Sequence, residues 1–274
     1  MAKIADLHIH THFSDSTSSP EEVVDQAFRL GIHCISITDH DILEGIAPTI
    51  RAAAAYDIEV IPGIELSTQA NNKDVHILGY LIDYENPGLI EELKLMQHSR
   101  LARMKLMISK LSELGVGEIS FEEVCALTES DAVGRPHLAT IMVKQGIVPN
   151  MRAAFDKYLA DDKPAFVPKL KLSASEGIRL ILKYGGVPVL AHPMFTMVDE
   201  LIPGLVDDGL KGIEVYYPNC MSATTEFYLN LSKKYNLIAT GGSDAHGSAK
   251  RNTYLGKLTI PYELVEQLKA AHRG

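Results

Sequence analysis

Apolar and polar positions divide most of the chain into short apolar segments that alternate with longer amphipathic ones. The apolar segments are rich in Val, Ile and Leu, which is typical of buried strands. They predict strands over residues 4–9, 34–38, 60–66, 75–81, 187–191, 212–216, 237–240 and 254–258. Helices are predicted between most of them and over 262–272. Repeated strand–helix units of this length predict an α/β fold with a parallel sheet, closed or nearly closed into a barrel.

Capping residues indicate where two of these helices begin and end. Ser19 and Pro20 suit the N-cap and the first helical position, and Gly31 lies just beyond the expected end. Ser173 and Glu176 have the spacing of a capping box. These signals predict helices over 20–30 and from residue 173 to residue 184.

The pattern changes between residues 87 and 168, where no buried strand is predicted. A long helix is expected over 89–114, a second begins after Ser120, and two more cover 136–145 and 151–159. We therefore divide the chain into a barrel, formed by residues 1–86 and 169–274, and a helical insertion over 87–168. An inserted layer beside a barrel mouth is expected to form one wall of the active site.

Composition limits the class of protein. With 274 residues, 46% of them apolar, the chain can bury a large core, and no apolar stretch is long enough to span a membrane. The first strand begins near the N-terminus, so no signal peptide is expected. Three scattered cysteines favour a reducing compartment, and we expect a cytoplasmic protein. The formal net charge of −9 argues against binding of long duplex DNA.

His8 and His10 lie two residues apart in the first predicted strand. Alternate side chains of a strand share a face, so both imidazoles are expected to point at one spot, with Leu7 and Ile9 on the opposite face. Asp15 follows in the next loop. Two imidazoles and a carboxylate at a strand end are typical of a metal site, although a surface pair of histidines explains the first two equally well.

Further metal-ligand residue types lie in or just after the other predicted strands. These are His40, Glu65, His76, His192, Glu214, Asp244 and His246. Taken singly, each is explained as a buried histidine or a capping acid. Together they predict a cluster at the carboxyl ends of the strands, the face where active sites form in α/β barrels.

Two features of the insertion favour an anionic ligand. Pro136 suits the first position of a helix and places Arg135 at its N-terminus, where free N–H groups and a guanidinium bind anions. Basic residues also recur between Lys94 and Lys110, with no Asp or Glu among them. A solvated helix face explains this second feature equally well.

The motifs together resemble the PHP (polymerase and histidinol phosphatase) family of metal-dependent phosphoesterases. The matching segments are DLHIHTHFSD at 6–15, TDHD at 38–41, PGIELS at 62–67, HILGY from His76, AHP at 191–193, GIEVYYP around Glu214 and GSDAH ending at His246. The resemblance implies a distorted (β/α)7 barrel. It also implies two or three divalent metal ions, with manganese expected and zinc, iron or magnesium as alternatives.

The resemblance further implies how the ligands are shared. One metal would use His8, His10, Glu65 and Asp244, a second Asp15, His40 and His246, and a third Glu65, His76 and His192. The insertion and its GRPH motif are similar to a branch that contains nucleoside 3′,5′-bisphosphate phosphatases, which also act as 5′→3′ exonucleases on short RNA. Arg135 and His137 would correspond to the phosphate-recognition motif of that branch, and Lys169, which returns the chain to the barrel, is a further candidate for binding substrate.

The expected reaction is hydrolysis of a phosphate monoester of a small nucleotide, foremost the 3′-phosphate of a nucleoside 3′,5′-bisphosphate, or 5′→3′ trimming of short RNA. The hypothesis is that the metals lower the pKa of a bridging water held by Glu65, with His246 and His192 nearby, and that the hydroxide attacks phosphorus. Asp6 is expected to hydrogen-bond a metal-ligating histidine, and Asp39 and Asp41 to orient imidazoles or to cap the backbone. The expected partner is a small nucleotide or short oligonucleotide, with no membrane.

Three alternatives stay open. A histidinol-phosphate phosphatase would use the same chemistry with a different pocket, and the insertion and GRPH motif count against it. Hydrolysis at carbon, as in amidohydrolases, uses similar barrels and is disfavoured by analogy alone. A metal-binding interaction module without catalysis belongs to another class, and the complete set of ligand residues argues against it.

Overall fold

The computed structural model describes residues 2–71, 73–128, 133–168, 172–250 and 253–273. Within these ranges one mixed sheet has the strand order β8-β7-β6-β4-β3-β2-β1-β9, with β5 beside β3. The strands are β1 (Ile4–Ile9), β2 (Cys34–Ile37), β3 (Glu59–Ala70), β4 (Lys73–Tyr80), β5 (Leu172–Ser173), β6 (Val187–Leu190), β7 (Gly212–Tyr216), β8 (Ile238–Gly241) and β9 (Ile260–Pro261). A bridge between Ile9 and Ala245 brings its two ends together, so the sheet is a nearly closed barrel, as predicted.

The direction of two strands differs from the predicted parallel sheet. β4 runs antiparallel to both β3 and β6, and β9 runs antiparallel to β1. The cause is local, because Ala70 pairs with Lys73 and the two strands form a tight hairpin, whereas a parallel pair needs a long crossover.

The strand predicted over 254–258 is wrong. The Lys257 N–H donates to the Tyr254 carbonyl at 2.9 Å, and Gly256 has a left-handed φ of 79°. These residues therefore form a turn, and the last strand follows it at Ile260–Pro261.

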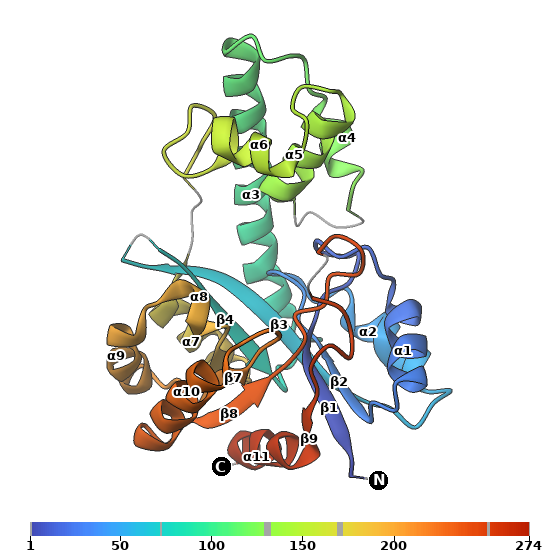
Figure 1. Cartoon of the computed structure of the whole chain (residues 1–274), viewed down its shortest axis with the longest axis vertical. Helices are drawn as coiled ribbons and strands as arrows, with labels where there is room; N and C mark the ends of the chain where they lie inside the picture. Colours follow the sequence, from blue (N-terminus) through green and yellow to red (C-terminus); the bar gives the residue numbers. More distant parts are fainter. Residues whose placement is uncertain (1, 72, 129–132, 169–171, 251–252, 274) are drawn as a thin grey trace.

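Helices cover the outside of the barrel (Figure 1). They are α1 (Pro20–Arg29), α2 (Ile46–Ala53), α7 (Ala174–Lys183), α8 (Pro193–Thr196), η2 (Asp199–Leu201), α9 (Ile202–Asp207), α10 (Ser222–Lys234) and α11 (Tyr262–Arg273). The predicted N-cap at Ser19 and the predicted capping box at Ser173 are both confirmed. Ser19 accepts from the Glu22 N–H at 3.2 Å, and Ser173 accepts from the Glu176 N–H at the same distance.

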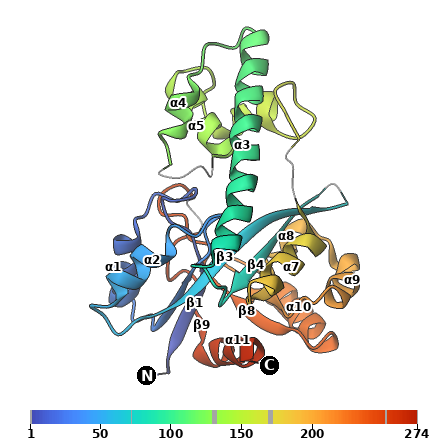
Figure 2. The same ribbon diagram turned by 180° about the vertical axis from the view of Figure 1, so that it is seen from behind.

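The insertion rises above the barrel in Figures 1 and 2. It consists of α3 (Pro87–Glu113), α4 (Phe121–Cys125), α5 (Arg135–Lys144), α6 (Met151–Ala154) and the π-helical turn η1 (Phe155–Leu159), as the pattern predicted. Its buried side chains form a cluster of their own, made only of residues between 101 and 167. Helix α3 enters both cores, because Leu89 and Leu93 pack in the barrel while Met107 and Leu111 pack in the insertion.

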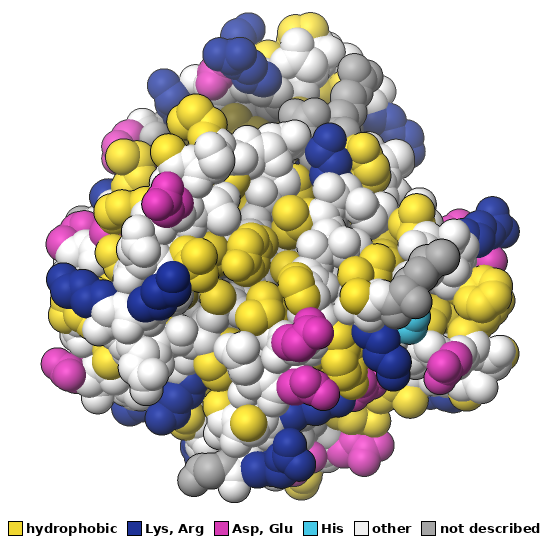
Figure 3. All heavy atoms as spheres, turned by 60° about the horizontal axis from the view of Figure 1, so that its bottom comes forward, with side chains coloured by type: hydrophobic (Ala, Val, Ile, Leu, Met, Phe, Trp, Pro, Cys, Tyr) yellow, Lys and Arg dark blue, Asp and Glu magenta, His cyan; other side chains and the backbone are white. Residues whose placement is uncertain are grey.

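Charge is mixed in sign on one face of the molecule. On the face drawn in Figure 3, Lys and Arg side chains are separated by apolar and acidic ones, so the described residues there form no continuous basic track. None of the described helices combines the length and the apolar character needed to cross a membrane.

Candidate metal centre

The nine predicted ligands meet at one end of the barrel because the strands deliver them there. His8 lies in β1 and His10 directly follows it, and both side chains are fully buried. Glu65 lies in β3 and His76 in β4. The other ligands lie in loops that follow strands, and they are Asp15, His40, His192, Asp244 and His246. β4 runs in the opposite direction, and His76 pairs with Ser67, two residues beyond Glu65 in β3. The His76 side chain nevertheless reaches Glu65, with Nδ1 2.8 Å from Oε1.

A first group joins two imidazoles and two carboxylates. His10 Nε2 lies 3.1 Å from Asp244 Oδ1 and 3.2 Å from Glu65 Oε2, and His8 Nε2 lies 3.4 Å from each of the same oxygens. The four ligand atoms lie within 4.8 Å of one another, which suits a single cation. These are the four residues that the resemblance assigns to one metal.

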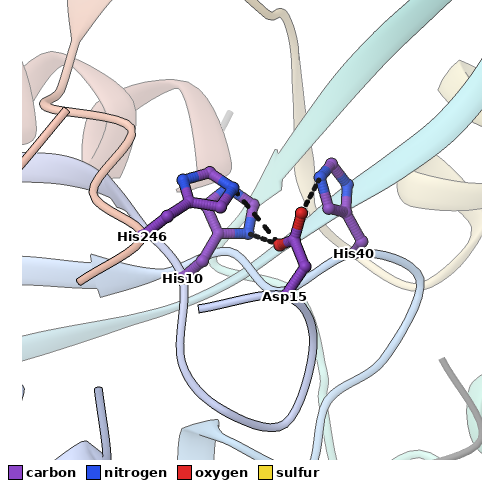
Figure 4. A group of neighbouring side chains, drawn as sticks. All are labelled: His10, Asp15, His40 and His246. Carbon is purple, nitrogen blue, oxygen red and sulfur yellow. Dashed lines mark ion pairs between the residues drawn. The ribbon is translucent and has the colours of Figure 1, made fainter. Parts of the chain in front are cut away.

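A second group surrounds Asp15 (Figure 4). Asp15 Oδ1 lies 3.2 Å from His246 Nε2 and 3.8 Å from His10 Nδ1, and its Oδ2 lies 4.0 Å from His40 Nε2. The expected set lacks His10, which the structure adds. The two ring nitrogens of His10 therefore face two different groups.

Glu65 connects the first group to a third. Its Oε1 lies 2.8 Å from His76 Nδ1 and 3.0 Å from His192 Nε2, while its Oε2 faces the first group and lies 3.2 Å from His40 Nδ1. The shared carboxylate agrees with the expected bridging role. His40 joins this group in addition to the expected residues.

Unpaired polar atoms indicate that these residues fit divalent metals. Among the described residues, the buried side-chain atoms without a hydrogen bond include both ring nitrogens of His10, Nε2 of His8, Nδ1 of His40 and His192, Oδ1 of Asp15 and Oε2 of Glu65. Each such group costs about 1–3 kcal/mol when nothing satisfies it. Imidazole nitrogens and carboxylate oxygens are the mixed donors that Mn, Fe and Zn accept.

Burial and charge together set the ionisation of the cluster. Burial favours the neutral form of Glu65, but His40 and His76 hold the pKa of its carboxyl well below the ordinary value. Burial also opposes charge on His10, yet Asp244 and Glu65 raise the pKa of that imidazole to about 9. Ionised carboxylates in so dry a site require positive charge beside them, which a divalent cation supplies without protonating the imidazoles.

Glu214 holds two of the histidines in place. One carboxylate oxygen lies 3.0 Å from His8 Nδ1, and the other accepts the backbone N–H of His192 at 2.7 Å. Glu214 is fully buried, and His192 has a left-handed φ of 27°. The contact leaves His8 Nε2 directed at the first group, so Glu214 is a positioning residue for two groups at once.

Asp6 and Asp39 stabilise the backbone beside the cluster. Asp6 accepts backbone N–H groups, from Ser243 at 2.8 Å and from His8 at 3.4 Å, and so ties β1 to the end of β8. Asp39 accepts from Thr11 and from the Ser14 hydroxyl at 2.5 Å, which fixes the loop before Asp15. Asp6 was expected to bond an imidazole and instead accepts backbone N–H groups, whereas the contacts of Asp39 are those of the capping role that was expected as the alternative.

Two further polar residues at the cluster were not predicted. Tyr217 donates its hydroxyl to Asp244 Oδ2 at 2.6 Å. Lys250 Nζ lies 2.8 Å from His246 Nε2, which is the acceptor nitrogen because Nδ1 faces the Asp244 carbonyl at 2.7 Å. Both lie in loops, where strand or helix periodicity gives no signal.

A cavity of about 630 Å³ separates the cluster from the insertion, and we call it the insertion cavity. Barrel residues Asp15, His40 and His76 line one side, and insertion residues Arg103, Arg135, His137 and Phe166 line the other. Helix α5 begins at Arg135, one residue before the expected start. Lys169 lies outside the described residues.

Arg135 and His137 have defined contacts in this cavity. The Arg135 guanidinium donates to Asp161 Oδ1 at 2.6 Å and lies over the rings of Phe155 and Phe166. His137 Nδ1 accepts the Gly134 N–H at 3.0 Å and thereby caps α5. Arg135 therefore presents a cation to the cavity from a fixed stack of rings.

A nearly closed barrel with three adjoining groups of imidazoles and carboxylates at one end defines a metal-dependent hydrolase. The sequence model of the PHP domain matches residues 6–161, and the chain belongs to the PHP family. It is therefore a metal-dependent phosphoesterase, an enzyme that hydrolyses ester bonds.

Similar proteins agree with this class. The chain is 32% identical over 262 residues to a 3′,5′-nucleoside bisphosphate phosphatase of Chromobacterium violaceum, covering 93% of this chain and 91% of the relative. It is 31% identical to the 5′-3′ exoribonuclease Rnm of Escherichia coli, covering 89% and 86%. A Bifidobacterium adolescentis structure assigned as a metal-dependent phosphoesterase superposes with a TM-score of 0.88 at 29% identity, covering 98% and 96%.

Proposed function

We propose that this chain removes the 3′-phosphate from a nucleoside 3′,5′-bisphosphate. The observation that carries the proposal is the insertion cavity, in which candidate metal ligands face Arg135 across one space. A substrate with two phosphates has two anionic centres, and this cavity has a metal-binding side and a guanidinium side. A relative 32% identical in sequence is named for this activity.

The nine ligand residues would hold two or three divalent ions, with manganese as the proposed metal. His8, His10, Glu65 and Asp244 form the first site, Asp15, His40 and His246 the second, and Glu65, His76 and His192 the third. Bound metals would supply a water nucleophile at neutral pH and neutralise charge on the reacting phosphate. Glu65, with His192 and His246 nearby, lies where that water would be held.

The remaining polar residues would orient the substrate. Arg135 offers several N–H donors in a fixed fork, which matches a phosphate in the way that a lysine does not. Its ion pair with Asp161 involves a carboxylate that is 61% exposed, and such pairs contribute only about 0–1 kcal/mol. The second phosphate can therefore displace Asp161. His137 and Lys169 remain proposed contacts to the same group.

Kinetics of Arg135→Ala test the proposal with two substrates that share the reacting 3′-phosphate. Adenosine 3′,5′-bisphosphate carries a second phosphate, and adenosine 3′-monophosphate does not. Loss of charge-assisted hydrogen bonds is expected to lower kcat/KM for the bisphosphate about 10- to 100-fold and to leave the monophosphate nearly unchanged.

Arg179→Ala is the matched control, because Arg179 also pairs with a surface aspartate, Asp208 at 2.9 Å, and lies outside this cavity. An equal loss on both substrates in Arg135→Ala would exclude recognition of the second phosphate.

The alternative function, a histidinol-phosphate phosphatase, is tested by measuring hydrolysis of histidinol phosphate by the unaltered enzyme. If it is hydrolysed faster than the bisphosphate, the proposed substrate class is wrong.

Trimming of short RNA from its 5′ end is a second candidate function. A relative 31% identical in sequence is named for this activity. The candidate metal ligands and Arg135, on the two sides of the insertion cavity, would then bind the terminal nucleotide of the RNA. The non-catalytic alternative is set aside, because the relatives that match along most of the chain are named as enzymes.

A further inference from the structure

Three large side chains form an apolar surface beside the metal centre. Phe195 in α8 is 63% exposed and Met197 directly after α8 is 69% exposed, whereas Tyr217 is buried and supports the Phe195 ring. We call these three residues the apolar platform. Exposed side chains of this size cost free energy in water, and their clustering in one place points to a ligand.

The apolar platform lines a second cavity of about 760 Å³, which we call the platform cavity. Glu65, His192 and Asp244, all candidate metal ligands, line the same cavity. The platform cavity also shares His40, Asp74, His76 and Asp161 with the insertion cavity. A ligand at the metal centre can therefore reach the platform on one side and Arg135 on the other.

The platform is held in a fixed arrangement. The rings of Phe195 and Tyr217 meet edge to face, with centroids 5.0 Å apart, and Tyr217 is anchored by its hydrogen bond to Asp244. Met197 has a left-handed φ of 48°, and its carbonyl accepts from Lys73 Nζ at 2.9 Å. The loop after His192 is thus tied to β4 through Lys73. The apolar platform is therefore a surface that exists before any ligand binds.

We propose that the apolar platform binds the nucleobase of the substrate, with Phe195 as the stacking residue. This inference rests on the proposed function. A nucleoside 3′,5′-bisphosphate has three recognisable groups, namely the reacting phosphate, the second phosphate and the base. The site has three matching features, namely the metal centre, Arg135 and the platform. An aromatic ring accepts any base through its π face, so Phe195 would select for a base without selecting which one.

Phe195→Ala tests the inference with a pair of substrates. Adenosine 3′,5′-bisphosphate is compared with 1,4-anhydroribitol 3,5-bisphosphate, which keeps both phosphates and lacks the base. Base stacking on an aromatic side chain contributes about 1–3 kcal/mol, so KM for the adenosine compound is expected to rise roughly 10-fold in the variant. KM for the base-free compound should not change, and Phe195→Trp should restore the adenosine value.

Phe227→Ala is a closely matched control. Phe227 is 47% exposed, meets Tyr228 edge to face at 5.0 Å, and does not line either cavity. It should behave as the unaltered enzyme with both substrates. Equal effects of Phe195→Ala on both compounds, or no effect on either, would overturn the inference.

Calorimetric binding of adenosine 5′-monophosphate separates this inference from the proposed function. That nucleotide is the product expected from the bisphosphate, and its binding needs no turnover. If the unaltered protein binds it through Phe195 but does not hydrolyse the bisphosphate, the proposed function fails and the platform stands. If the unaltered protein hydrolyses the bisphosphate and Phe195→Ala binds the product normally, only the platform is wrong.

Discussion

Glu214 links two of the candidate metal sites through a single side chain. It contacts the ring of His8 with one oxygen and the backbone of His192 with the other. A carboxylate at His8 Nδ1 fixes the tautomer, so that the lone pair of Nε2 faces the cluster. The same carboxylate stabilises the strained backbone of His192, whose φ is 27°, by accepting its N–H at 2.7 Å.

Glu214→Gln is expected to weaken metal binding about 10- to 100-fold, the range seen when such supporting partners of metal ligands are altered. The amide keeps the size of the side chain, but it cannot offer acceptors to both histidines with the strength of a carboxylate. Calorimetric titration of the metal-free variant with Mn²⁺ measures the change. Glu92→Gln, which alters a surface acid paired with Lys183, should bind manganese as the unaltered protein does. Normal affinity in Glu214→Gln would contradict the positioning role.

The sequence predicted the candidate metal ligands better than it predicted the residues that hold those ligands in place. His8 and His10 were expected on one face of a strand, and period-two alternation is enough to place them there. Tyr217 and Lys250 reach the cluster from loops whose paths depend on the packing of distant strands. Asp39 was expected to orient an imidazole or to cap the backbone, and only the folded loop shows that Thr11 and Ser14 take up its oxygens.

Close packing of two strand ends places the first pair of ligands. Gly242, directly after β8, lies against His8 in β1, and a Cβ built on it would meet the backbone nitrogen and Cβ of His8. No side chain fits there unless the backbone of β1 moves. The register of β1 against the end of β8, and with it the direction of His8, therefore depends on a glycine.

Gly242→Ala is expected to lower the free energy of unfolding by about 1–3 kcal/mol through overpacking, and to weaken metal binding by displacing His8. Urea unfolding and manganese titration measure the two effects. Gly204→Ala is the control, because Gly204 lies in α9 with nothing within 4 Å of the added Cβ. There the same change should stabilise the helix by up to about 1 kcal/mol. A Gly242→Ala protein as stable as the unaltered one would disprove the packing argument.

The sequence was informative about where strands lie and less so about their direction. Val60–Leu66 and Val75–Leu81 were predicted from apolar runs, but an apolar run has the same composition in either direction. The segment around Asn71 between them is a turn signal that favours a hairpin over a crossover. The false strand over 254–258 contains Gly256, whose turn interrupts a pattern that otherwise resembles β-structure.

At the scale of the whole molecule, two hydrophobic cores share one helix. α3 packs in the barrel through its first turns and in the insertion through its later ones. All nine candidate ligands belong to the barrel, and none belongs to the core of the insertion. We propose that residues 87–168 behave as a separate unit whose position over the barrel sets the shape of the insertion cavity.

Removal of metal should therefore affect the two units unequally. Ligands that bind only the folded state stabilise it, by about 2.7 kcal/mol at a concentration 100 times the Kd. Treatment with a chelator is expected to lower the Tm, and Mn²⁺ should restore it. Hydrogen exchange followed by mass spectrometry should show faster exchange in β1, β3 and β8, which carry or precede His10, Glu65 and Asp244, and little change in peptides from 104–125 and 135–159.

Asp244→Asn provides the control for this experiment, because it replaces a ligand carboxylate of the first group by an amide and should reduce the metal-dependent shift in Tm, while the other two groups keep their ligands. Equal acceleration of exchange in both units would mean that the barrel and the insertion unfold together, and the proposed division would then be wrong. A change confined to the barrel would mean that metals fix the reacting end of the site while the insertion, with Arg135, stays free to adjust to the substrate. Recognition of the second phosphate by Arg135 would then be independent of metal binding, because the metal ligands and Arg135 lie on opposite sides of the insertion cavity.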